Sequence, residues 1–99
     1  MSVLTLRNGA FVPGTTQNII TTGSSQVLNA VGANTSIIRV ACTADTFVQI
    51  GTSPVATTQS MMISGGATEF LAVVPGQTKV AVLEVTTAGV VSVTELTGY

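Results

Sequence analysis

Hydrophobic and polar residues alternate most clearly over residues 37–51, with the sequence IIRVACTADTFVQIG. Ile38, Val40 and Cys42 occupy every second position, which places them on one face of a β-strand and Arg39 on the other. An aspartate then interrupts the alternation, and the side chain of this residue type bonds nearby backbone amides in turns. A second alternating run follows and ends at a glycine. The pattern therefore predicts two β-strands joined by a tight turn.

Shorter runs of the same kind occupy most of the remaining chain. Threonine and valine dominate them, and turn residues interrupt them about every eight to twelve positions. The apolar spacing of three and four residues that a helix requires is never sustained. The predicted further strands are 18–22, 25–31, 60–64, 68–74, 78–86 and 90–97. We expect an all-β fold, a small antiparallel β-sandwich for which jelly-roll connections are one option, with a small barrel as the alternative.

The strongest turn signal is the dipeptide Pro75 and Gly76, because proline presets the first central position of a β-turn and glycine supplies the second. It predicts a hairpin between residues 68–74 and 78–86. In the second of these runs the apolar residues change parity, so either a bulge interrupts the strand or both faces of the sheet are covered. For residues 90–97 the alternation leaves open which face forms the core.

The N-terminal residues lack this regular pattern, because turn dipeptides separate apolar residues that have no sustained period. We interpret residues 1–16 as an extended N-terminal arm and residues 17–99 as a single sandwich domain. An edge strand over residues 3–6 is the alternative for the arm. A solvated tail would be more polar, so we expect the arm to dock on a partner. Its candidate contact residues are Val3, Leu4, Leu6, Phe11 and Val12.

Charged residues make up 7% of the chain, against roughly 25% in ordinary soluble domains. A chain of 99 residues can build only one modest core, so we expect neighbouring molecules to cover part of its surface. No run approaches the ~20 apolar residues of a membrane-spanning helix, which argues against a membrane partner. Arg7, Arg39 and Lys79 are too scattered to form a phosphate-binding track, which argues against nucleic acid.

The residue types that most enzymes use are scarce. The chain has no histidine, the commonest general base and metal ligand, and its carboxylates stand singly. Cys42 is the single cysteine, which excludes an internal disulfide, and we interpret it as a buried free thiol. Met61 and Met62 are either core-filling residues, the more frequent role, or an adaptable contact surface. The sequence predicts no enzyme activity, no catalytic residue, no metal site and no cofactor.

From residue 37 onward the chain resembles a pattern in small virion proteins of tailed bacteriophages. The pattern has a strand of the form IRV-x-ATAD, an aromatic residue and an IG, a TxPxAT loop and a GG turn before an acidic–aromatic pair. A PGQ turn with KVAVL and a closing AGxxSVTE strand complete it. The matching segments are 38–45, 47–51, 53–57, 65–70, 75–83 and 88–95.

The resemblance implies a capsid decoration or cement protein, made in the host cytoplasm and carried on the capsid surface. Such a protein stabilises the shell by bridging capsomers. Its expected partners are the major capsid protein and further copies of itself, as a dimer or a trimer. The alternative is a tail- or vertex-associated host-contact module that displays residues 51–59. Residues 1–34 lie outside the resemblance.

Overall fold

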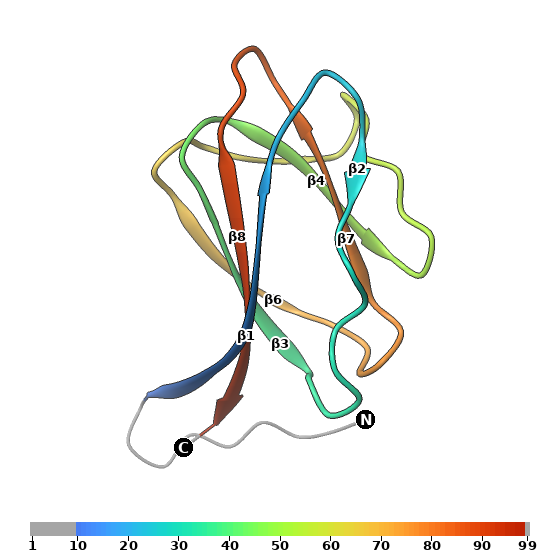
Figure 1. The fold of residues 1–99 in the computed structure, drawn as a ribbon, viewed down its shortest axis with the longest axis vertical. Helices are drawn as coiled ribbons and strands as arrows, with labels where there is room; N and C mark the ends of the chain where they lie inside the picture. Colours follow the sequence, from blue (N-terminus) through green and yellow to red (C-terminus); the bar gives the residue numbers. More distant parts are fainter. Residues whose placement is uncertain (1–9, 99) are drawn as a thin grey trace.

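The computed structural model describes residues 10–98, which form eight β-strands and no helix. The strands build two antiparallel four-stranded sheets that face each other, which confirms the expected β-sandwich (Figure 1). The described residues contain no helix that is long and apolar enough to cross a membrane. The strands are β1 (Phe11–Ile20), β2 (Gln26–Val27), β3 (Ile37–Cys42), β4 (Thr46–Gly51), β5 (Met61–Ile63), β6 (Thr68–Ala72), β7 (Lys79–Glu84) and β8 (Val90–Gly98).

Sheet A has the strand order β1-β8-β3-β6, and sheet B has the order β2-β7-β4-β5. The first strand thus pairs with the last, the second with the seventh, the third with the sixth and the fourth with the fifth. This order results when one long hairpin, with β1–β4 in one arm and β5–β8 in the other, is rolled up. It is the strand order of the eight-stranded jelly roll. Except for β4 and β5, strands that are consecutive in the chain lie in different sheets.

The connection between β6 and β7 corrects one prediction. Pro75 and Gly76 do form a turn, in which Gly76 has a φ of 75°, a conformation that only glycine adopts without steric cost. However, β6 pairs with β3 in sheet A, whereas β7 pairs with β2 and β4 in sheet B. The predicted hairpin of residues 68–74 and 78–86 is therefore wrong. The turn signal marks a reversal of the chain but does not determine which strand each arm joins.

The core lies between the two sheets and follows the predicted alternation in β3, where Ile38, Val40 and Cys42 are buried. In β8 the core side proves to be that of Val91 and Val93. Valine and isoleucine dominate the interior, which suits strands because β-branched side chains pack well on a pleated surface. The core residues are Leu28, Val31, Ile38, Val40, Cys42, Val48, Ile63, Val73, Val80, Val82, Val91 and Val93.

Strand β7 is covered on both faces, which settles the change of parity seen in the sequence. Its register against β4 is uninterrupted, so there is no bulge, and the outward-facing Ala81 has no exposed surface. The loop between β4 and β5 lies over it. The Ala56 N–H donates to Ser25 Oγ just before β2 (2.9 Å), and Ser60 Oγ donates to Gln49 Oε1 on β4 (3.1 Å). Because β7 lies between β2 and β4, the loop crosses its outer side.

Strand β1 includes part of the segment that was interpreted as an arm. It begins at Phe11 and pairs with β8, so the boundary expected after residue 16 falls inside this strand. A β-bulge between Pro13 and Thr16 bends it, because an extra residue in one strand increases the local twist. The candidate contact residues Val3, Leu4 and Leu6 lie outside the described residues.

Candidate interaction surfaces

The candidate contact residues that the structure describes fall on the two different sheets. Phe11 and Val12 begin β1 in sheet A, whereas Met61 and Met62 form most of β5 at the edge of sheet B. The structure does not bring them together into one surface. It places each pair beside residues from other strands, and two separate apolar patches result.

The first patch, the aromatic patch, consists of Phe11, Phe70 and Leu96 on the outer face of sheet A. The rings of Phe11 and Phe70 stack with centroids 5.6 Å apart and planes 21° apart. They belong to the two edge strands of the sheet, so the pair reaches across the two strands between them. This explains why Leu96 of β8, which faces outward, is only 6% exposed. Phe70 remains 51% exposed and offers an accessible apolar surface.

The second patch, the methionine patch, consists of Phe47, Met62 and Leu83 on the outer face of sheet B. Phe47 lies opposite Met62 on one side and Leu83 on the other. Met62 is 50% exposed and Met61 is 46% exposed, so the core-filling interpretation of the methionines is wrong. The reason is that β5 is a three-residue edge strand in which Ile63 alone is buried.

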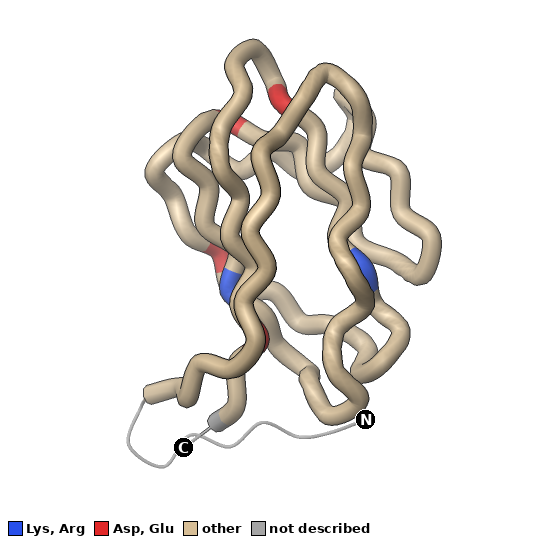
Figure 2. Tube along the Cα trace, viewed as in Figure 1, with Lys and Arg blue, Asp and Glu red and all other residues tan. Residues whose placement is uncertain are grey.

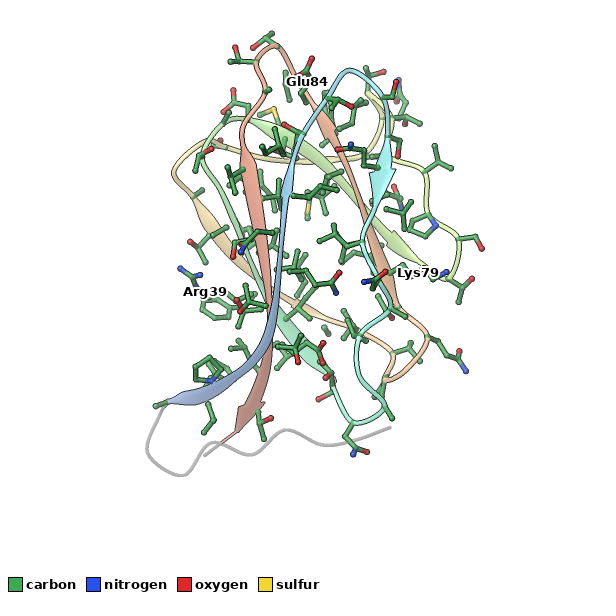
Figure 3. All side chains as sticks on the ribbon, in the orientation of Figure 1. Arg39, Lys79 and Glu84 are labelled. Carbon is green, nitrogen blue, oxygen red and sulfur yellow. The ribbon has the colours of Figure 1, made fainter. Side chains whose placement is uncertain are left out.

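Charges are sparse on this molecule (Figure 2), but Arg39 lies directly beside Phe70 on the outer face of sheet A. The side chains of Arg39 and Lys79 point away from the core on opposite sheets (Figure 3). No charged residue is paired with the methionine patch, so this patch can be buried against apolar surface at little electrostatic cost. A partner of the aromatic patch has to leave the neighbouring Arg39 side chain in water or pair it with an acceptor. The charged side chains of the described residues are Arg39, Asp45, Glu69, Lys79, Glu84 and Glu95.

Two of the carboxylates hold loops in place. Asp45 Oδ1 accepts the N–H of Gly65 at 2.7 Å, which fixes the turn after β5. Glu95 Oε1 accepts the N–H of Gly32 at 2.9 Å and the hydroxyl of Thr35, which fixes the loop before β3. Among residues 10–98 no three His, Cys, Asp or Glu side chains gather as a metal site would require. These carboxylates therefore act as structural acceptors.

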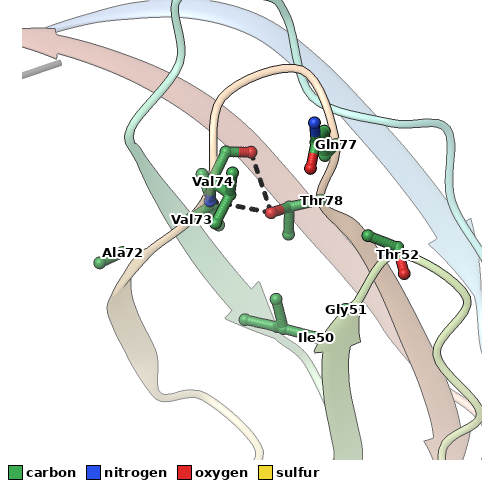
Figure 4. A pocket seen from close by; sticks show the side chains of 8 residues that line it. All are labelled: Ile50, Gly51, Thr52, Ala72, Val73, Val74, Gln77 and Thr78. Atoms are coloured by element: carbon green, nitrogen blue, oxygen red, sulfur yellow. Dashed lines mark hydrogen bonds between the residues drawn. The ribbon is translucent and has the colours of Figure 1, made fainter. Parts of the chain in front are cut away.

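A cleft of about 370 Å³ opens between the end of β4 and the turn that joins β6 to β7 (Figure 4). Aliphatic groups of Ile50, Val73 and Val74 line much of it. The hydroxyl of Thr78 is already satisfied, because it donates to the Val74 carbonyl (3.0 Å) and accepts the Val74 N–H (2.9 Å). The cleft therefore offers mainly apolar contact.

Cys42 lies in the core and is 4% exposed, which confirms the prediction of a buried free thiol. Burial raises the pKa of this thiol above its ordinary value of 9.0, and a hydrogen bond with Thr46 opposes the shift. The thiolate is the reactive form of cysteine, so Cys42 is chemically inert at neutral pH.

We expect Cys42 to remain unmodified by a thiol reagent at pH 8 in the folded protein and to react fully in denaturant. Because the folded state holds the thiol proton more tightly, this group contributes stability below its unfolded pKa of 9.0 and loses it as pH rises through the raised value. Melting temperatures between about pH 8 and pH 10 should decline less for Cys42→Ala than for the native chain. Rapid labelling without denaturant would contradict the burial of the thiol.

No family model matches the chain, and no curated protein and no solved structure matches it either.

Proposed function

We propose that this protein is a capsid decoration or cement protein of a tailed bacteriophage, which stabilises the shell by bridging neighbouring capsomers. The observation that supports this most directly is the placement of the aromatic patch and the methionine patch on opposite outer faces of one sandwich. A bridging protein needs two contact surfaces at a fixed separation. Two packed sheets, whose backbones lie ~10 Å apart, supply that separation.

The composition of the patches supports the same proposal. Phe70 and Met62 are about half exposed, and aromatic residues and methionine are enriched in the buried centres of interfaces, where charge is depleted. The proposed partners are the major capsid protein and further copies of this chain. A ligand that binds only the assembled shell stabilises it by mass action, and the stabilisation grows as the free ligand concentration rises above its dissociation constant.

The proposal predicts that each patch is needed for particle binding. Phe70→Lys and Met62→Lys place a charge where an apolar contact is expected, and each should weaken binding to phage shells by at least about tenfold, since an unpaired buried charge costs several kcal/mol. The measurement is co-sedimentation of the variants with shells assembled without this protein. Thr87→Lys, in an exposed turn outside both patches, is the matched control.

Normal binding of both patch variants would overturn the bridging proposal. The copy number per particle tests the alternative of a tail- or vertex-associated host-contact module. A copy number comparable to that of the capsid protein is expected for decoration, whereas a handful of copies would favour the alternative. The loop of residues 51–59 lends the alternative little support, because Pro54 and Ala56 are buried against the domain and Val55 is its prominent exposed apolar residue.

A further inference from the structure

The four edge strands of the sandwich differ in how well they are protected from pairing with another chain. Short strands and charged residues that point inward at an edge both block such pairing. β2 has two residues and β5 has three, and β6 carries Glu69 on its inward-facing side. β1 has ten residues and no charge. Its first half contains Pro13 and the bulge, but residues 16–20 form a regular, unprotected edge.

The hydrogen bonds of β1 show which backbone groups are free along this edge. The N–H of Thr21 donates to the carbonyl of Gly89 at 2.8 Å. In an antiparallel pair the bonded positions alternate, so Gln17 and Ile19 are the next residues whose backbone groups face β8. The N–H and C=O groups of Asn18, and of the residues two positions before and after it, consequently point away from the sheet.

Strand β8 gives an independent check of which β1 residues turn their backbone groups toward it. The N–H of Thr43 donates to the carbonyl of Val90 at 3.0 Å, so the even-numbered residues of β8 direct their backbone N–H and C=O groups toward β3. The backbone groups of Val91 and Val93 must then point toward β1, and the register pairs these residues with Ile19 and Gln17. Both sides of the ladder therefore agree.

The outward-pointing groups belong to Thr16, Asn18 and Ile20, and no other strand of the described residues pairs with this edge. Ile20 is 65% exposed. On the core-facing side of the strand the Gln17 side chain already has partners, because it accepts the N–H of Asn29 (2.8 Å) and donates to the Asn29 carbonyl (3.0 Å). What remains open is a row of backbone donors and acceptors, and another β-strand satisfies such a row.

We propose that β1 is the interface of a symmetric dimer, in which the β1 strands of two copies pair antiparallel around a two-fold axis at Asn18. In this register Asn18 lies opposite Asn18 of the second copy, and Thr16 lies opposite Ile20 of the second copy. Each of these pairs exchanges both of its N–H···O bonds, so every free group on the edge finds a partner. The two A sheets become one continuous sheet.

The absence of charge on β1 is the reason for choosing a second copy as the occupant. The residue on the two-fold axis meets its own symmetry mate, so a charged residue at position 18 would face a like charge. The exposed outer-face residues of this edge are neutral and small enough to lie side by side across the axis. The dimer leaves the methionine patch on sheet B uncovered, and the inference does not depend on the proposed capsid role.

The test is sedimentation velocity of the full chain and its variants over a range of concentrations. The native chain should dimerise, and Asn18→Pro should raise the dimer dissociation constant at least about tenfold because it removes N–H groups at the axis. Proline is tolerated on an edge strand where the N–H faces solvent, so the unfolding midpoint of dilute Asn18→Pro should stay close to native. Asn18→Ser keeps the N–H and should still dimerise.

A second variant covers the case in which the proline disturbs the fold. Asn18→Lys keeps the backbone donor but opposes two like charges at the axis, so it should be monomeric at low salt and regain dimerisation as salt screens the repulsion. A native chain that is monomeric at all concentrations would overturn the inference. So would a dimer that survives both substitutions, or one that only Met62→Lys disrupts. A monomer that still binds shells would leave the capsid proposal intact.

Discussion

Replacing Ile38 with alanine is expected to lower the free energy of unfolding by about 2–5 kcal/mol. Ile38 has no exposed surface and lies in β3, which has a neighbour on each side in sheet A. The surroundings of such a central position relax poorly, so the substitution loses both the transfer free energy of the side chain and the contacts around the cavity it leaves. Urea denaturation followed by circular dichroism measures the change.

Ile37→Ala is the matched control, because it removes the same atoms from the adjacent residue. Ile37 points to the outer face of sheet A and is only half-buried. Its truncation should cost less than half as much as that of Ile38. Equal effects at the two positions would contradict the assignment of the core face of β3.

Gly89→Ala is expected to cost about 1–3 kcal/mol through overpacking. A methyl group at Gly89 would lie 2.7 Å from the Cβ of Ala44 and 2.9 Å from Thr43 Oγ1. Neither neighbour moves easily. The N–H of Thr43 donates to the Val90 carbonyl (3.0 Å), and its hydroxyl accepts the N–H of Val90 (2.8 Å).

The double variant Gly89→Ala with Ala44→Gly tests the cause of that loss. Removing the Ala44 methyl relieves the shortest contact, so part of the cost should be recovered as a favourable interaction energy between the two sites. Gly66→Ala is the control. Gly66 has a φ of 82° and open space around it, so its cost of about 1–2 kcal/mol is conformational and Ala44→Gly should not reduce it. Full additivity at Gly89 would contradict the steric explanation.

The fold class could be predicted from the sequence because alternation is a local property. β3, β4 and β8 lie within a residue or two of the expected positions, and the buried face of β3 was correctly assigned. Alternation does not tell which strand lies next to which, so the hairpin around Pro75 and Gly76 was wrong. The strand expected over residues 25–31 is regular only at Gln26–Val27. After these two residues, the N–H groups of Leu28 and Val31 still donate to the carbonyls of Val80 and Thr78, at the start of β7 and just before it.

The interaction surfaces were less predictable because they combine residues from strands that are far apart in the sequence. Their apolar character marks Phe11 and Met62 as candidates in the sequence, but which residues lie beside them, Phe70 and Phe47, depends on the pairing of the strands. Leu83 was the exception. Leu83 departs from the alternation of apolar residues in β7, which indicated that the second face of the sheet is covered. In the structure Leu83 belongs to the methionine patch.

The pairing of β1 with β8 also governs when the molecule can fold. During synthesis the first strand of sheet A leaves the ribosome long before its partner has been translated, and β3 likewise waits for the same partner. Sheet A therefore forms only after translation has reached β8, and the final step must bring together segments from opposite ends of the polypeptide. Topologies dominated by such distant contacts fold in milliseconds to seconds rather than microseconds, so this jelly roll is expected to mature slowly and after translation.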